Sequence, residues 1–204
     1  EMPGQGDPVR QLGEQYKGVG LIWAQENHSK KGITCDLREP EGQRIIRELV
    51  RLSDVVAENF RPGTLERWNL GYEALREVNP GIIMVRVSAY GQTGPLASRP
   101  GFGRVAQAFG GLTYLAGYPD RPPVNPGSAT IADYAAGLFA AYGTMVALEH
   151  RRRSGRGQYI DVSLFESVFR VLDNLALAYD TLGVVRERMG TATPHAVPHN
   201  HYPT

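Results

Sequence analysis

Short apolar runs recur along the chain and are separated by stretches with helical periodicity. Residues 33–37 and 54–58 form two such runs, residues 82–87 (IIMVRV) are almost continuously apolar, and Tyr159–Val162 is a fourth run. Short runs rich in β-branched residues are typical of strands buried in a parallel sheet. We therefore predict four strands at these positions.

Helical patterns lie between and after the predicted strands. Gly110-Gly111 weakens the pattern at residues 105–115. The longest pattern has Ser128 or Thr130 as a candidate N-terminal cap and ends before Gly155 and Gly157. The predicted helices cover residues 41–52 with Pro40 in the first turn, 64–68, 72–77, 105–115, about 130–152 and 164–182. Strands that alternate with helices predict an α/β fold built on a Rossmann-like, largely parallel sheet flanked by helices.

Composition and charge narrow the functional classes. The 204 residues include 22 Lys and Arg against 21 Asp and Glu, so the net charge is +1 and no general affinity for nucleic acid is indicated. No run of about 18 apolar residues stands out, so no membrane span is expected. Cys35 is the single cysteine, which excludes an intrachain disulfide and suits a reducing compartment such as the cytoplasm.

Both ends of the sequence lie in loops. The chain opens on a Gly/Pro-rich stretch, residues 2–8, and closes on residues 194–204, which contain three prolines. Domains do not often begin and end within loops, so we expect this chain to be part of a longer protein.

Asp133 is the first candidate for chemistry. It lies one turn into the long small-residue helix, where an acidic residue is usually a favourable partner of the helix dipole. The functional alternative is a carboxylate nucleophile, because helix N–H groups would lie near the reacting centre and small neighbours would leave room for a substrate. The spacing by itself favours the dipole interpretation.

The segment Glu58-Asn59-Phe60 ends a predicted strand of the sheet. Ligands of open α/β sheets bind beyond the carboxyl ends of the strands. Asn59 could hydrogen-bond a purine or amide and Phe60 could stack on a ring, but the same residues could equally form a simple turn.

Two other clusters fit structural roles better. The basic run Arg151-Arg152-Arg153 with Arg156 lies at a helix end, where cations favour the dipole. His195, His199 and His201 crowd the last loop, and two prolines flank the i, i+4 pair His195 and His199, so no helix would present them as a metal site. We predict no bound metal.

Several segments together, in order along nearly the whole chain, resemble the family III CoA-transferases, which include formyl-CoA transferase and the carnitine CoA-transferases. The matching segments are KGITCDLREPEG (31–42), DVVAENFRPG (54–63), SAYGQTGP (88–95), RPGF (99–102), the helix around Ala132-Asp133, and SGRGQ (154–158). Members of this family are about twice as long, so the chain resembles a central part of one. Residues 1–183 would belong to the large CoA-binding domain, and residues 184–204 would begin the linker to the small domain.

The resemblance implies roles for individual residues. Asp133 matches the catalytic aspartate, whose carboxylate attacks the thioester of an acyl-CoA. Asn59 and Phe60 match residues that hold the adenine end of CoA, and Arg67 matches an arginine that contacts CoA. Arg38 matches a basic position near the CoA phosphates.

Tyr90 and Phe102 are expected near the acyl group. The related α-methylacyl-CoA racemases have a histidine at the position of Phe102, where it transfers protons. Phenylalanine cannot carry a proton, and racemisation needs a base on each face of the α-carbon. The resemblance therefore favours transfer of CoA between carboxylic acids, through an aspartyl anhydride and thioester, over racemisation.

Two alternatives stay open: an epimerase on the same fold, and a CoA-binding module without catalytic activity. The family also implies an interlocked homodimer. Because this chain would lack part of that assembly, we expect the 204-residue piece on its own to be inactive.

Overall fold

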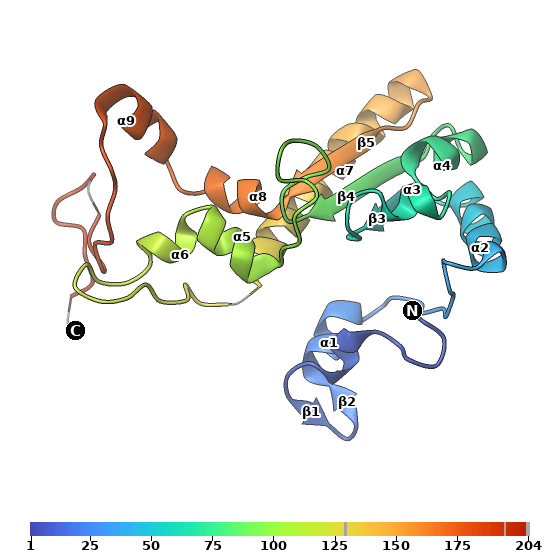
Figure 1. The fold of residues 1–204 in the computed structure, drawn as a ribbon, viewed down its shortest axis with the longest axis horizontal. Helices are drawn as coiled ribbons and strands as arrows, with labels where there is room; N and C mark the ends of the chain where they lie inside the picture. Colours follow the sequence, from blue (N-terminus) through green and yellow to red (C-terminus); the bar gives the residue numbers. More distant parts are fainter. Residues whose placement is uncertain (129, 194, 203–204) are drawn as a thin grey trace.

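A three-stranded parallel sheet forms the centre of the structure, a computed structural model that describes residues 1–128, 130–193 and 195–202. The strand order is β3 (Val55–Glu58), β4 (Ile83–Ser88) and β5 (Tyr159–Ser163), with β4 in the middle (Figure 1). All three strands were expected from their apolar runs. The prediction of an α/β fold with a parallel sheet is confirmed.

Side chains alternate between the two faces of β4, as the geometry of a strand requires. Ile83 and Val85 join one hydrophobic cluster, whereas Ile82 and Met84 join another. The first cluster includes residues of α5 (Gly103–Phe109), α7 (Ile131–Ser154) and α8 (Leu164–Arg170). The second includes residues of α2 (Pro40–Arg51), α3 (Thr64–Arg67) and α4 (Tyr72–Val78). The sheet is thus covered by helices on both faces.

Helix α7 runs along the sheet and brings Asp133 to its edge. The helix begins after Thr130 and ends at Gly155, whose φ of 73° is readily adopted by glycine. Ala132 and Ala136 are fully buried, and their small side chains allow the helix to approach β4 and β5 closely. Length and hydropathy alone would also allow this helix to cross a membrane. One such helix is weak evidence, because a core helix meets the same criteria.

The predicted strand at residues 33–37 is wrong for the described structure. Residues 33–36 have no regular secondary structure. The N–H of Cys35 donates to the carbonyl of Glu1 over 2.8 Å, the amine of Glu1 donates to the carbonyl of Ile33 over 2.8 Å, and the carbonyl of Asp36 accepts the N–H of Glu39 in a local turn over 3.2 Å. A ladder needs several consecutive residues paired with a neighbouring strand, so no strand forms here.

The predicted helix at residues 164–182 is also wrong, because it is two helices. Residues 171–174 separate α8 from α9 (Leu175–Leu182), and among them Asp173 adopts a φ of 59°, a left-handed conformation that a continuous helix does not contain. The pattern at 105–115 divides in the same way into α5 and α6 (Leu112–Leu115), since Gly111 has a φ of 95°.

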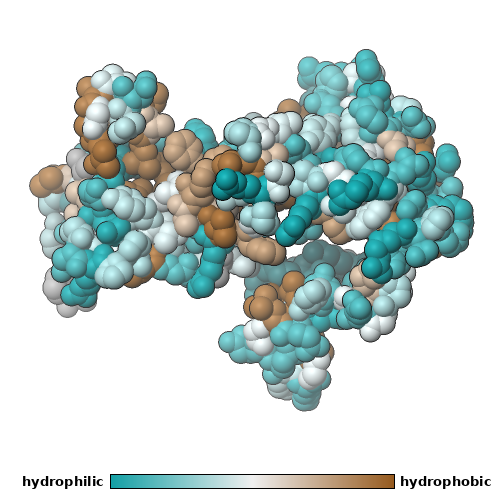
Figure 2. Space-filling view, in the orientation of Figure 1, coloured by the Kyte–Doolittle hydropathy of each residue, from teal (hydrophilic) through white to brown (hydrophobic). Residues whose placement is uncertain are grey.

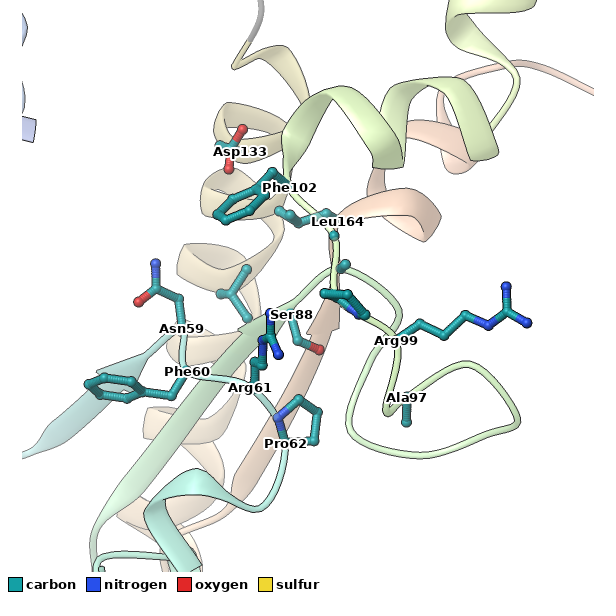
Figure 3. A pocket seen from close by; sticks show the side chains of 14 residues that line it. Asn59, Phe60, Arg61, Pro62, Ser88, Ala97, Arg99, Phe102, Asp133 and Leu164 are labelled. Atoms are coloured by element: carbon teal, nitrogen blue, oxygen red, sulfur yellow. The ribbon is translucent and has the colours of Figure 1, made fainter. Parts of the chain in front are cut away.

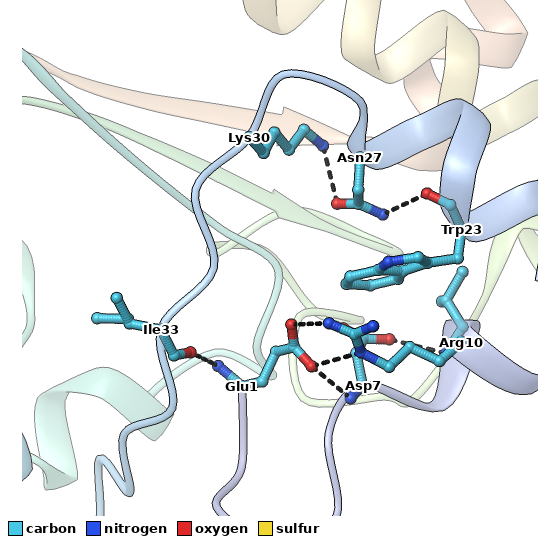
Figure 4. A network of polar contacts seen from close by, with 8 residues as sticks. Glu1, Asp7, Arg10, Trp23, Asn27, Lys30 and Ile33 are labelled. Atoms are coloured by element: carbon cyan, nitrogen blue, oxygen red, sulfur yellow. Dashed lines mark hydrogen bonds and ion pairs between the residues drawn. The ribbon is translucent and has the colours of Figure 1, made fainter. Parts of the chain in front are cut away.

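An N-terminal arm precedes the sheet and was not assigned from the sequence. It contains the short helix η1 (Pro8–Gln11), the hairpin β1 (Gln15–Tyr16) and β2 (Val19–Gly20), and α1 (Leu21–Asn27). Polar contacts organise it (Figure 4): Arg10 donates to the Glu1 carboxylate over 2.7 and 2.8 Å, and its guanidinium lies 4.0 Å from the centre of the Trp23 ring.

Apolar side chains remain exposed on two helices. Leu138 and Tyr142 of α7 are 74% and 72% exposed. On α9, Leu177 and Leu182 are 70% and 74% exposed, and apolar side chains cover this helix at the upper left of Figure 2.

The described residues after α9, 184–193 and 195–202, contain no helix or strand, which is compatible with a linker. The proposed domain boundary at residue 184 stays a prediction.

Candidate active site

The carboxyl ends of the three strands surround one cavity. Its volume is about 160 Å³, and one end of α7 and the loop before α5 complete its wall (Figure 3). The residues that line it are Asn59, Phe60, Arg61, Pro62, Val87, Ser88, Ala89, Ala97, Arg99, Pro100, Gly101, Phe102, Asp133 and Leu164. This is the place where an open parallel sheet binds its ligands.

The structure brings four of the seven predicted site residues together. Asn59, Phe60, Phe102 and Asp133 all line the cavity although they are far apart in the sequence. In Figure 3 the ring of Phe102 lies beside Asp133, whereas Asn59 and Phe60 follow the end of β3. The other three, Arg38, Arg67 and Tyr90, are not among the lining residues.

Asp133 is a carboxylate without a cationic partner. It lies in the first turn of α7, it is exposed to solvent, and no ion pair within the described residues includes it. Partial desolvation raises its pKa, against the opposite effect of a hydrogen bond from its own backbone N–H. An ionised carboxylate that is incompletely hydrated is suited to act as a nucleophile.

The turn that carries Asn59 and Phe60 is fixed from behind. The backbone N–H of Phe60 donates to Oε2 of Glu58 over 2.7 Å. The Phe60 ring meets the ring of Trp68 edge to face, with 5.3 Å between the ring centres. Phe60 nevertheless stays 38% exposed, so part of its ring is free to contact a ligand.

Arg67 and Arg38 both lie outside the cavity wall. Arg67 is the last residue of α3, and its guanidinium donates to Oγ1 of Thr64 over 3.0 Å. Arg38 precedes α2 and forms an ion pair with Asp36 over 2.6 Å. Hydrogen bonds from Arg38 lower the pKa of Asp36 to about 2. Their expected contacts with CoA stay predictions.

Tyr90 belongs to an aromatic cluster. Its ring meets Phe109 edge to face at 5.2 Å and lies tilted at 5.9 Å from Phe165. These contacts tie the segment after β4 to α5 and α8. Tyr90 therefore supports the site from outside the cavity in this structure, and its expected role near the acyl group stays a prediction.

Sequence reasoning missed three polar residues of the wall: Arg61, Arg99 and Ser88. The guanidinium groups of Arg61 and Arg99 form no ion pair within the described part of the chain. In Figure 3 the side chain of Arg99 extends outward. The hydroxyl of Ser88 is buried and has no hydrogen-bond partner among the described residues. All three lie in or beside the segments that carry the family resemblance, and that position was the available signal.

A contact from the N-terminal arm also reaches this region. The hydroxyl of Tyr134, next to Asp133, donates to the Glu26 carboxylate over 2.9 Å, across 108 positions of sequence. No sequence pattern pointed to this pair. Within the described residues, no three His, Cys, Asp or Glu side chains gather as metal ligands.

The architecture defines an α/β protein with a strand-end ligand site and an unpaired carboxylate at a helix N-terminus. The sequence pattern of CoA-transferase family III matches residues 1–204, so the chain belongs to this family.

Named relatives are similar over the whole chain. The beta subunit of succinyl-CoA–L-malate CoA-transferase from Chloroflexus aurantiacus is 50% identical over 206 residues, which cover 100% of this chain and 51% of that protein. Acetyl-CoA:oxalate CoA-transferase from Acetobacter aceti is 36% identical over 198 residues, which cover 97% of this chain and 51% of that protein.

A crystal structure of a CAIB/BAIF family protein from Brucella suis matches with a TM-score of 0.89 and 38% identity, over 98% of this chain and 54% of that one. The chain spans about half the length of the curated relatives that it matches.

Proposed function

We propose that the whole protein is a CoA-transferase that moves CoA from an acyl-CoA donor to a carboxylic acid acceptor, with Asp133 as the nucleophile. The observation that carries the proposal is the position of Asp133 in the cavity wall, unpaired and with a raised pKa. Ser88, which carries a hydroxyl in the same wall, has no hydrogen-bonded base among the described residues to activate it. Family membership and the names of the relatives support transfer of CoA in general.

The proposed reaction returns the Asp133 carboxylate unchanged. The carboxylate attacks the thioester carbonyl, the C–S bond breaks, and a mixed anhydride and CoA thiolate result. The thiolate attacks the aspartyl carbonyl, releases the donor acid and leaves an aspartyl-CoA thioester. The acceptor carboxylate then displaces CoA to form a second anhydride, and the thiolate attacks its acceptor carbonyl to give the new acyl-CoA.

Positioning supplies much of the rate, because a carboxylate is a weak nucleophile. The first turn of α7 holds the carboxylate at the cavity, and the buried Ala132 and Ala136 fix the helix against the sheet. Among the described side chains that line the cavity, Asp133 alone is a carboxyl, histidine or cysteine group. This supports transfer over racemisation, which needs two proton carriers.

Label transfer in the whole protein tests the reaction. Because relatives are named for succinyl-CoA with malate and for oxalate, succinyl-CoA and ¹³C-malate are the first pair to try. Transfer predicts ¹³C-malyl-CoA, and malate labelled with heavy oxygen should leave one heavy oxygen on the peptide that contains Asp133. Exchange of the α-proton with solvent, without transfer, would instead indicate an epimerase. CoA binding without either reaction would indicate a binding module.

Asp133→Asn should lower kcat/KM by at least about a thousandfold, as is usual when a covalent nucleophile is removed. Asp120→Asn is the matched control, because Asp120 is an exposed carboxylate in a loop with only a long, 3.9 Å contact to Arg121. Full activity of Asp133→Asn would eliminate the proposed nucleophile.

We further propose that the whole protein is a cytoplasmic homodimer. The exposed apolar side chains of α7 support a covering partner or segment, and the single cysteine suits a reducing compartment. Light scattering of the whole protein tests the oligomeric state.

A further inference from the structure

A buried arginine lies behind the turn that carries Asn59 and Phe60. Arg86, in the middle strand β4, is 4% exposed and lies on the face of Ile82 and Met84. A buried guanidinium is costly unless carboxylates and hydrogen bonds compensate it. Its partners therefore show what the burial achieves.

Two carboxylates from different elements converge on Arg86. Glu58 ends the neighbouring strand β3 at the same register and forms a very short ion pair with Nε of Arg86. Glu66 of α3 contacts Nη1 over 2.5 Å and Nη2 over 3.2 Å. The guanidinium thus joins the end of a strand to a helix that lies outside the sheet.

Each carboxylate also lies next to a residue expected to bind CoA. Through Oε2, Glu58 accepts the backbone N–H of Phe60 over 2.7 Å, which fixes the Asn59–Phe60 turn. Glu66 directly precedes Arg67 on the single turn of α3. One guanidinium therefore sets the position of the turn and of the helix relative to each other.

The second cavity beside Arg86, of about 360 Å³, offers a less suitable explanation. Arg86 lines it, but so do Glu66 and Glu73. The carboxylates of Glu58 and Glu66 already pair with the guanidinium of Arg86, so an anionic ligand would gain little there. Buried ion pairs can often be replaced by apolar residues without loss of stability, so stability alone does not explain this network either.

Building on the proposed function, we propose that Arg86 is a positioning residue for CoA, which holds the Asn59–Phe60 turn and Arg67 in register through Glu58 and Glu66. The network acts on the nucleotide end of CoA and not on the acyl transfer at Asp133. It therefore matters for a substrate that has the nucleotide and not for one that lacks it.

Steady-state kinetics of the whole protein with succinyl-CoA and with succinyl-pantetheine, which lacks the nucleotide, separate the two ends. Glu66→Gln removes the charge of a half-exposed carboxylate, so the variant is expected to fold. We expect it to raise KM for succinyl-CoA about tenfold, as loss of a charged hydrogen bond allows, with kcat and the succinyl-pantetheine kinetics unchanged. Arg86→Lys, which keeps the charge but loses the two-sided fork, should act in the same direction and more strongly.

Glu73→Gln is the matched control. Glu73 lines the same cavity but pairs with Arg76 over 3.1 Å and should leave both substrates unaffected. Equal loss for both substrates in Glu66→Gln would overturn the proposal, and so would no loss for either. If Arg86→Lys does not fold, the kinetics of Glu66→Gln with the two substrates test the proposal without it. A wild-type protein that does not turn over succinyl-CoA would reject the proposed function instead, so the two failures are distinguishable.

Discussion

Two carboxylates near the edge of one sheet have opposite environments. The side chain of Glu58 is 3% exposed, is paired with Arg86 and accepts the backbone N–H of Phe60. Asp133 is exposed, has no ion-pair partner within the described residues, and its pKa is raised by partial desolvation. A paired and buried carboxylate fixes geometry, whereas the charge of an unpaired one is less stabilised and is therefore more reactive toward an electrophile.

The difference also indicates how the fold distributes its electrostatic costs. The desolvation cost of burying Arg86 and Glu58 is offset by the ion pair between them and by the second ion pair of Arg86 with Glu66. Desolvation raises the pKa of Asp133, and no cation among the described residues offsets this cost by pairing with the carboxylate. Functional groups often keep such an unfavourable environment because reactivity depends on it. The predictions below test whether the two carboxylates differ in this way.

The largest difference should appear in stability. Glu58→Ala leaves Arg86 without its buried partner and should lower the free energy of unfolding by about 3–5 kcal/mol, a typical cost of breaking a buried pair. Asp133→Ala should not lower it, because no pairing is lost. Urea unfolding of the whole protein measures both. Similar destabilisation by the two variants would contradict the comparison.

A smaller effect is expected on substrate affinity. Phe60→Ala removes a partly exposed ring at the cavity and should raise KM for succinyl-CoA by roughly tenfold, since stacking on a base contributes about 1–3 kcal/mol. Phe169→Ala is a control, because Phe169 is 43% exposed on α8 and does not line the cavity. An unchanged KM in Phe60→Ala would place the adenine elsewhere.

The smallest effects concern pH, and their signs are opposite. Folding raises the pKa of Asp133, so its charged form is penalised and the penalty appears as pH rises through that pKa. Asp133→Asn should therefore gain thermal stability relative to wild type near neutral pH but not well below the ordinary pKa of aspartate.

Glu66 should behave in the opposite way. The hydrogen bond from Arg86 lowers its pKa, so it stabilises the fold above its ordinary pKa, and this contribution is lost as pH falls through the lowered value. Glu66→Gln should therefore be less stable than wild type near neutral pH, with the difference closing in acid. Melting temperatures across this pH range measure both variants, and differences of the same sign would contradict the assignment.

Much of the sheet could be predicted from the sequence. The apolar runs at β3, β4 and β5 located all three strands, and Pro40 and Gly155 correctly marked ends of α2 and α7. These signals are local, since strand burial and helix termination depend on neighbouring residues. The run at 33–37 failed because a strand also needs a partner, which is a property of the surrounding fold.

The sequence alone determined the fold class, the family resemblance and the candidacy of Asp133, because each depends on residue types in a fixed order. Only the tertiary structure decided that Asp133, Phe102 and Asn59 share one cavity while Tyr90 packs outside it. It also decided that Arg86 joins Glu58 to Glu66, since these side chains come from separate elements. Parallel strands bring their carboxyl ends together only when the sheet forms, so contacts across those ends have no local signal in the sequence.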